Sequence, residues 1–159
     1  MSNKSAISLA LFFLVSINAY AQSVNEKVLK CLEDTKFENL DNFNEQRMNF
    51  QFAAWAKKLH LECDRMISRM SSEKVEAIAQ EREAVIAMAK LSESCDVLKA
   101  VQNPLQKIEK IYKEKIKEKT TKPSANMLTV EDNKAYLMTL DDAKELKKQL
   151  ETIIKKLKL

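Results

Sequence analysis

Glycine is absent from all 159 residues of this chain, and only two residues are proline. Glycine readily takes the left-handed backbone conformations that tight turns and phosphate-cradling loops require. Its absence excludes a P-loop, a glycine-rich dinucleotide fingerprint and a nucleophile elbow. It also disfavours β-hairpins, because their two-residue turns depend on glycine. We therefore expect an all-α fold.

The first 21 residues predict a secretory signal peptide. Lys4 precedes an apolar stretch over 7–15, and Ala19 and Ala21 flank Tyr20. This order of charge, apolar run and small residues precedes signal cleavage, which we expect after Ala21. A retained anchor is the alternative, but the apolar run is shorter than the roughly 20 residues that span a bilayer. The prediction is an exported protein, either periplasmic or extracellular.

The remaining residues suffice for one domain with a core of its own. We predict a helical bundle over 22–121, a linker over 122–128 and a C-terminal helical segment over 129–159 that packs on the bundle. The expected architecture is an antiparallel bundle of four to five helices after the cleaved signal peptide.

Capping boxes predict where the first helices begin. Ser23 with Glu26, and Asn42 with Glu45, have the spacing of such boxes. One apolar stripe with helical spacing follows the second box: Met48, Phe52, Trp55, Leu59, Cys63, Met66 and Met70. Ser71 and Ser72 interrupt the pattern before it continues to Asn103. A helical hairpin is our interpretation, and a single rod over 42–102 is the alternative.

Two lysine-rich helices are predicted in the C-terminal half. The first starts near Leu105 and ends near Thr120, and its exposed face would carry Lys107, Lys110, Lys113 and Lys117. Thr129 with Asp132 and Thr139 with Asp142 are further capping boxes. The second box starts a helix with a short heptad seam formed by Ala143, Leu146, Leu150, Ile153 and Leu157.

Three cysteines permit one intrachain disulfide, which an oxidising compartment favours. An up-down-up arrangement of the first three helices sets Cys31 and Cys95 at one height, with Cys63 about 20 Å away. We predict a Cys31–Cys95 bridge and a free Cys63. If 42–102 were one rod, Cys63 and Cys95 would lie roughly 48 Å apart and covalent dimers would become plausible.

A soft-metal site is one interpretation of His60, Cys63, Met66 and Met70, since sulfur and imidazole suit copper(I) or zinc. The same spacing, however, places the three sulfur residues in the middle of the apolar stripe. Methionine and cysteine at helical spacing are usually core residues. We favour the core interpretation and expect no cofactor.

We expect no enzymatic activity. The single histidine could pair only with Cys63, and no orienting group or oxyanion loop is identifiable. Every basic residue after Arg82 is lysine, whereas specific nucleic-acid contacts favour the arginine fork. The sequence therefore predicts no specific nucleic-acid partner.

One motif resembles the SXP family of secreted helical nematode antigens. It comprises Trp55-Ala56-Lys57-Lys58, then Leu91-Ser92, then residues 98–103, and the resemblance covers about 40–105. It implies a small exported helical protein, for which binding of divalent cations or ligands has been proposed. The chain departs from the family by its three cysteines and by the missing glycine after the tryptophan motif.

Three functions remain open. The leading hypothesis is a non-catalytic binding protein that clasps a partner protein or an apolar ligand in a groove lined by Phe52, Trp55, Leu59, Met66 and Met70. The second is a soft-metal protein that uses Cys63 and its neighbours. The third is an envelope protein in peripheral contact with a membrane through its lysine-rich half. A homo-oligomer is possible, and a stable one would support the leading hypothesis.

Overall fold

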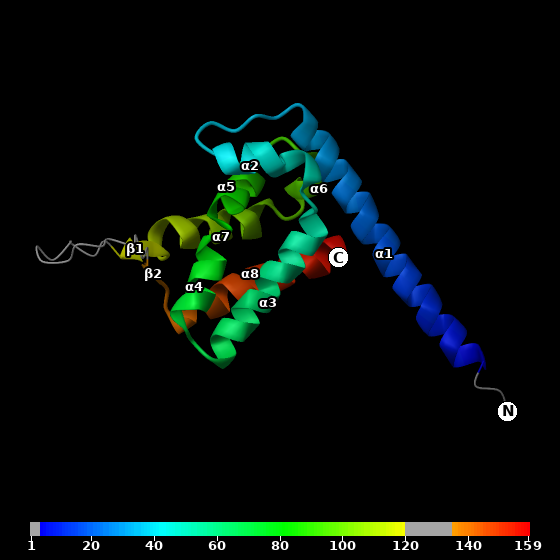
Figure 1. The fold of residues 1–159 in the computed structure, drawn as a ribbon. Coiled ribbons are helices and arrows are strands. Elements are labelled where there is room, and N and C mark those ends of the chain that lie inside the picture. The colour runs from blue at the N-terminus through cyan, green and yellow to red at the C-terminus, as the bar shows by residue number, and fades with distance from the viewer. Residues whose placement is uncertain (1–3, 120–134) are drawn as a thin grey trace, which may run out of the picture.

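The computed structural model describes residues 4–119 and 135–159. Its helices are α1 Lys4–Glu33, α2 Asp41–Gln46, the 3₁₀-helix η1 Arg47–Asn49, α3 Phe52–Ser68, α4 Ser72–Ala79, α5 Arg82–Leu91, α6 Asp96–Lys99, α7 Gln102–Glu114 and α8 Leu140–Leu157. Two short strands, β1 Lys117–Lys119 and β2 Ala135–Leu137, complete the fold. The predicted all-α class is confirmed, with more and shorter helices than expected (Figure 1).

Helix α1 runs without interruption through the predicted cleavage point and projects beyond the other helices at its N-terminal end (Figure 1). The expected helix start at Ser23 is therefore wrong. Alanine and leucine precede Ser23, and neither proline nor glycine stops the helix. Within the described ranges, no helix is both long and apolar enough to cross a membrane.

The chain turns back near Ser71, as the hairpin interpretation of residues 42–102 predicted. The alternative of a single rod is wrong. Helix α3 ends at Ser68, and Arg69 is extended. The Ser71 side chain then accepts a hydrogen bond from Lys74 N and caps α4. The returning limb, expected as one helix, is divided into α4, α5 and α6. Ser92 ends α5, and its hydroxyl bonds back to Ala89 O, which competes with helix continuation.

Helices α2 and α3 are capped by side chains from other helices. Their own N-cap residues, Leu40 and Gln51, make no side-chain cap. Glu83 of α5 accepts a hydrogen bond from Phe43 N at 2.8 Å, and Asn25 of α1 accepts one from Ala53 N at 2.8 Å. The predicted box of Asn42 and Glu45 does not form, because α2 begins one residue earlier and Asn42 donates to Glu83 instead.

Helix α8 closes the core against α3 and α7. Its predicted capping box forms, with Thr139 and Asp142 bonding each other's backbone N–H groups. Four of its seam residues are buried: Ala143, Leu146, Leu150 and Ile153. Tyr112 of α7 is also fully buried, and its hydroxyl donates to Ile78 O at 2.7 Å. The other predicted box, Thr129 with Asp132, lies outside the described residues.

Strands β1 and β2 form an antiparallel pair in which Glu118 lies opposite Tyr136. The sequence disfavoured a hairpin because tight turns depend on glycine. This pair avoids that restriction, because residues 120–134 separate the strands and no two-residue turn joins them. The predicted helix around Leu105 consequently ends at Glu114, and the backbone enters β1 three residues later.

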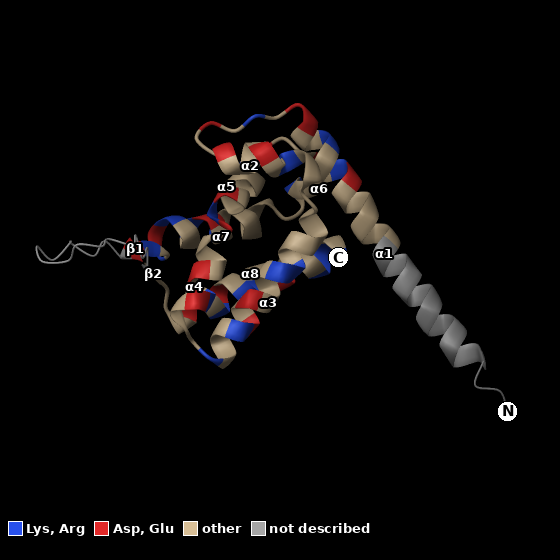
Figure 2. Cartoon of the chain, in the orientation of Figure 1, with Lys and Arg blue, Asp and Glu red and all other residues tan. Residues whose placement is uncertain are grey.

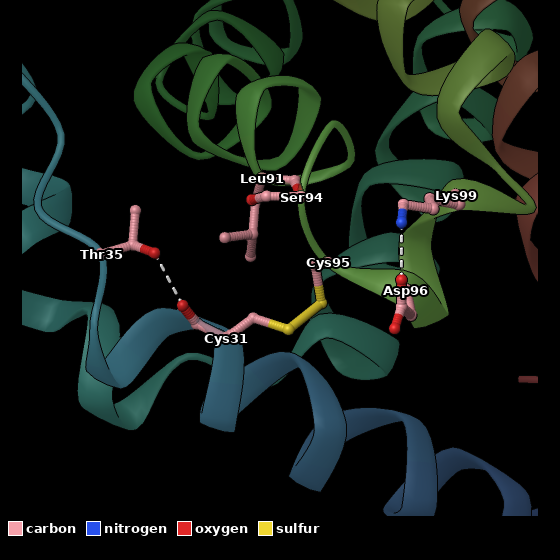
Figure 3. Close-up of a disulfide and its surroundings, with 7 residues drawn as sticks. All are labelled: Cys31, Thr35, Leu91, Ser94, Cys95, Asp96 and Lys99. Atoms are coloured by element: carbon pink, nitrogen blue, oxygen red, sulfur yellow. Dashed lines mark hydrogen bonds and ion pairs between the residues drawn. A yellow bond between two sulfur atoms is a disulfide. The ribbon is translucent and has the colours of Figure 1, made fainter.

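A disulfide joins Cys31 of α1 to Cys95, the N-cap residue of α6, with a Cα–Cα distance of 5.8 Å (Figure 3). This is the predicted pair, and Cys63 is the free cysteine. Thr35 follows α1 and donates its hydroxyl to Cys31 O at 2.7 Å. The disulfide therefore fixes the C-terminal end of α1 to the bundle.

Two of the described residues take left-handed backbone conformations, although neither is glycine. Asn39, in the loop before α2, has φ 59°, and Lys158, at the C-cap of α8, has φ 53°. Asparagine tolerates this conformation, whereas lysine does so at a steric cost.

Candidate binding site

The four candidate soft-metal ligands lie in different environments. Cys63 and Met66 are fully buried in the core, while Met70 follows the end of α3 and is 52% exposed. His60 lies at the surface, with Nε2 3.3 Å from Glu151 Oε1 and Nδ1 3.7 Å from Asp64 Oδ2. In the part of the chain that the structure describes, no three His, Cys, Asp or Glu side chains gather as a metal ion requires.

The environment of Cys63 opposes metal binding and nucleophilic chemistry. Burial, assisted by the charges of Asp64 and Glu62, raises the pKa of its thiol to about 12. Only the thiolate is a good nucleophile or metal ligand. A thiol with this pKa is protonated at neutral pH, so the residue behaves as a small apolar core side chain.

The groove predicted along the stripe is occupied by the protein itself. Phe52, Leu59 and Met66 are fully buried, and Met70 is exposed. Helices α1 and α8 pack against α3 and cover this face. Prediction of a groove at these residues was wrong because helical spacing identifies the buried face and not the element that buries it. Of the five, Trp55 lines the hollow described below, and the other four do not.

The four lysines predicted for membrane contact are exposed on α7 and β1. Two of them form ion pairs within α7, Lys113 Nζ with Glu109 Oε1 at 2.7 Å and Lys110 Nζ with Glu114 Oε1 at 4.0 Å. Acidic and basic residues are interspersed over the described part of the fold (Figure 2). This surface is mixed in charge and is not a continuous cationic face.

An open hollow of about 1000 Å³ lies between α2, η1, the start of α3, the α4–α5 junction and the two strands. Its walls combine aromatic, carboxamide and charged side chains. The aromatic residues are Phe43, Phe50, Trp55 and Tyr136, the carboxamides Asn42, Gln46, Asn49, Gln51 and Gln80, and the charged residues Lys58, Glu81, Arg82, Glu83 and Glu118. Such walls offer both apolar contact and hydrogen bonds.

A series of ring contacts forms the aromatic wall. The ring centroids of Phe37 and Phe43 lie 5.6 Å apart, those of Phe43 and Phe50 5.2 Å, and those of Phe50 and Trp55 5.7 Å. Edge-to-face and tilted pairs at these distances are favourable. Trp55 is 6% exposed, and its indole N–H has no acceptor among the described residues.

The carboxylates around the hollow already have partners. Glu81 Oε1 lies 2.8 Å from Lys58 Nζ, and Glu118 accepts a hydrogen bond from the Tyr136 hydroxyl at 3.3 Å. Glu83 accepts from Asn42 Nδ2 at 3.0 Å as well as from Phe43 N. Glu83 thereby connects α5 to α2 and fixes the position of the α2 wall.

No protein-family model, curated protein or solved structure matches the chain.

Proposed function

We propose that this protein is an exported, non-catalytic binding protein that holds a segment of a partner protein in the hollow. The observation that carries the proposal is the combination of an aromatic wall with five carboxamides in one open hollow. Carboxamides donate to and accept from peptide groups, and aromatic rings accommodate apolar side chains. Most charged side chains of the walls already have partners within the protein: Lys58 pairs with Glu81, Glu83 bonds α2, and Glu118 bonds Tyr136.

Export is the second part of the proposal. The sequence pattern of residues 1–21 and a disulfide that ties α1 to α6 both support an oxidising destination. Expression of the full chain in a secreting host, followed by mass measurement of the exported material, tests this part. The expected mass lacks residues 1–21, and retention of the intact chain inside the cell would argue against export.

Tryptophan emission provides the binding test, because Trp55 is the only tryptophan in the chain. Random peptides displayed on phage are selected against the protein, and the enriched peptides are titrated while Trp55 emission is followed. We expect a saturable change that is lost in Phe50→Ala, because Phe50 lines the hollow and contacts Trp55.

Leu61→Ala is the matched control, since Leu61 is a 47% exposed apolar residue of α3 outside the hollow. This variant should bind as the unaltered protein does. Failure of every enriched peptide to change Trp55 emission, or equal loss of binding in both variants, would count against the hollow as the binding site.

A further inference from the structure

Two cations line the hollow, Lys58 and Arg82. Of these, Arg82 has no anionic partner among the described residues. It is half-buried, and its guanidinium makes one hydrogen bond, to Ile116 O. Lys58, the other cation of the walls, is paired with Glu81. A guanidinium has five N–H donors, so most of the donors of Arg82 remain for an occupant.

One further donor group belongs to the same hollow. Residues 81–84 line it and form the N-terminal end of α5, where the N-cap residue Glu81 makes no side-chain cap. The backbone N–H groups at a helix N-terminus favour anions. The Trp55 side chain also lines the hollow, but its indole N–H is buried and faces no solvent. The nearby carboxylates are engaged, Glu81 with Lys58 and Glu83 with α2.

We propose that the hollow recognises a ligand with a carboxylate group. Arg82 pairs with the carboxylate, and the apolar remainder of the ligand lies against the aromatic wall. This inference rests on the proposed binding function and adds the chemical class of the ligand. The planar guanidinium fork binds a carboxylate through two parallel hydrogen bonds, an arrangement that lysine cannot reproduce. Either the C-terminus of a peptide or a free organic acid supplies such a group.

Matched pairs of probes that differ only in the carboxylate test the proposal. Octanoate is compared with octanamide, and N-acetylated random tetrapeptides with a free C-terminus are compared with their C-terminal amides. Trp55 emission measures binding. We expect the acid to bind about tenfold or more tightly than the amide, in keeping with the strength of charge-assisted hydrogen bonds. The pair that shows this preference identifies the source of the carboxylate.

Variants of Arg82 assign the preference to its side chain. Arg82→Gln keeps a donor for Ile116 O but removes the charge, and it should lose most of the preference for the acid. Arg82→Lys should retain a reduced preference for the acid. Arg65→Gln is the control, because Arg65 is an exposed arginine of α3 paired with Glu62 and does not line the hollow.

Equal binding of acid and amide to the unaltered protein would overturn the carboxylate proposal and leave the binding function standing. An acid preference that is undiminished in Arg82→Gln would also overturn it. Should Arg82→Gln fail to fold, the comparison of acid with amide on the unaltered protein and on Arg82→Lys still decides. If neither these probes nor any phage-selected peptide changes Trp55 emission, the binding function itself fails.

Discussion

At the scale of single residues, Cys63 shows how burial removes the chemistry of a reactive side chain. Its thiol is fully buried next to Met66, in an environment that raises its pKa to about 12. Cysteine reactivity requires a thiolate and access to solvent, and this residue has neither.

We predict that Cys63 resists alkylation until the protein unfolds. Without reductant, iodoacetamide should add no group to the native protein and one group per chain in denaturant, as counted by mass spectrometry. The Cys63→Ala variant should take up none under either condition. Rapid labelling of the native protein would contradict the burial, and more than one group in denaturant would contradict the disulfide.

Helical spacing predicted the buried residues of α3 well, but it failed at the two ends of the stripe. Phe52, Leu59, Cys63 and Met66 are fully buried, as expected. Met48 and Met70 are 44% and 52% exposed, because α3 begins after Met48 and ends before Met70. A periodic pattern extrapolates a helix beyond its ends wherever the chain leaves helical geometry.

At the scale of elements, helix starts were predictable only where the capping residues are local. Thr139 and Asp142 lie three residues apart and cap α8 as predicted. The caps of α2 and α3 come from Glu83 and Asn25, which are distant in sequence.

The sequence did not predict the hollow, because its walls come from segments that only the tertiary structure brings together. An indication in the sequence was the concentration of phenylalanine, asparagine and glutamine over 42–52, where we predicted only the start of a helix.

Loss of the α8 cap should destabilise the protein measurably. Thr139→Ala removes one half of the capping box, and we expect the free energy of unfolding to fall by about 1 kcal/mol. Urea denaturation followed by circular dichroism measures the change. Thr152→Ala serves as the control, because Thr152 lies inside α8 and its hydroxyl only bonds Lys148 O of the same helix. An equal effect of both substitutions would argue against a capping role.

A pH effect is expected where α3 meets α8. The Asp64–Lys147 hydrogen bond, 2.6 Å long, lowers the pKa of the Asp64 carboxyl, with Coulombic help from Lys147 and His60. The native state therefore favours the ionised form. Its stabilising contribution is complete above the unfolded pKa of about 3.9 and disappears as the pH falls through the lower native value.

Melting temperatures of Asp64→Asn and of the unaltered protein, measured from neutral to acidic pH, test the direction of this pH dependence. The variant should melt below the unaltered protein at neutral pH, and the difference should vanish in strong acid. The effect will be small, because Asp64 is 41% exposed and solvent screens the pair. Asp34→Asn, an exposed carboxylate without an ion pair among the described residues, should show a flatter difference. A gap for Asp64→Asn that widens in acid would contradict the assignment.

At the scale of the whole molecule, the disulfide is the longest-range covalent constraint in the described structure. It joins residues 64 positions apart and attaches α1 to a bundle that α3, α7 and α8 build among themselves. The Cys31–Cys95 pairing could be predicted from the expected lengths of the helices. The two cysteines lie at the same height in the bundle although the returning limb is divided into three helices.

Removal of this bond should have the largest effect of the substitutions considered. The double variant Cys31→Ala, Cys95→Ala should lose about 4 kcal/mol of unfolding free energy, as expected for a loop of this length. Urea midpoints measure the loss, and reduction of the Cys63→Ala variant should reproduce it. An unchanged midpoint would show that α1 is held by packing alone.

The absence of glycine has a consequence beyond this protein. Left-handed backbone is provided by Asn39 in the loop before α2 and by Lys158 at the C-cap of α8, and β1 pairs with β2 although no two-residue turn joins them. A chain of nineteen kinds of amino acid thus forms an extensive apolar core. It offers a starting point for studies of reduced amino-acid alphabets that omit glycine, the one achiral residue.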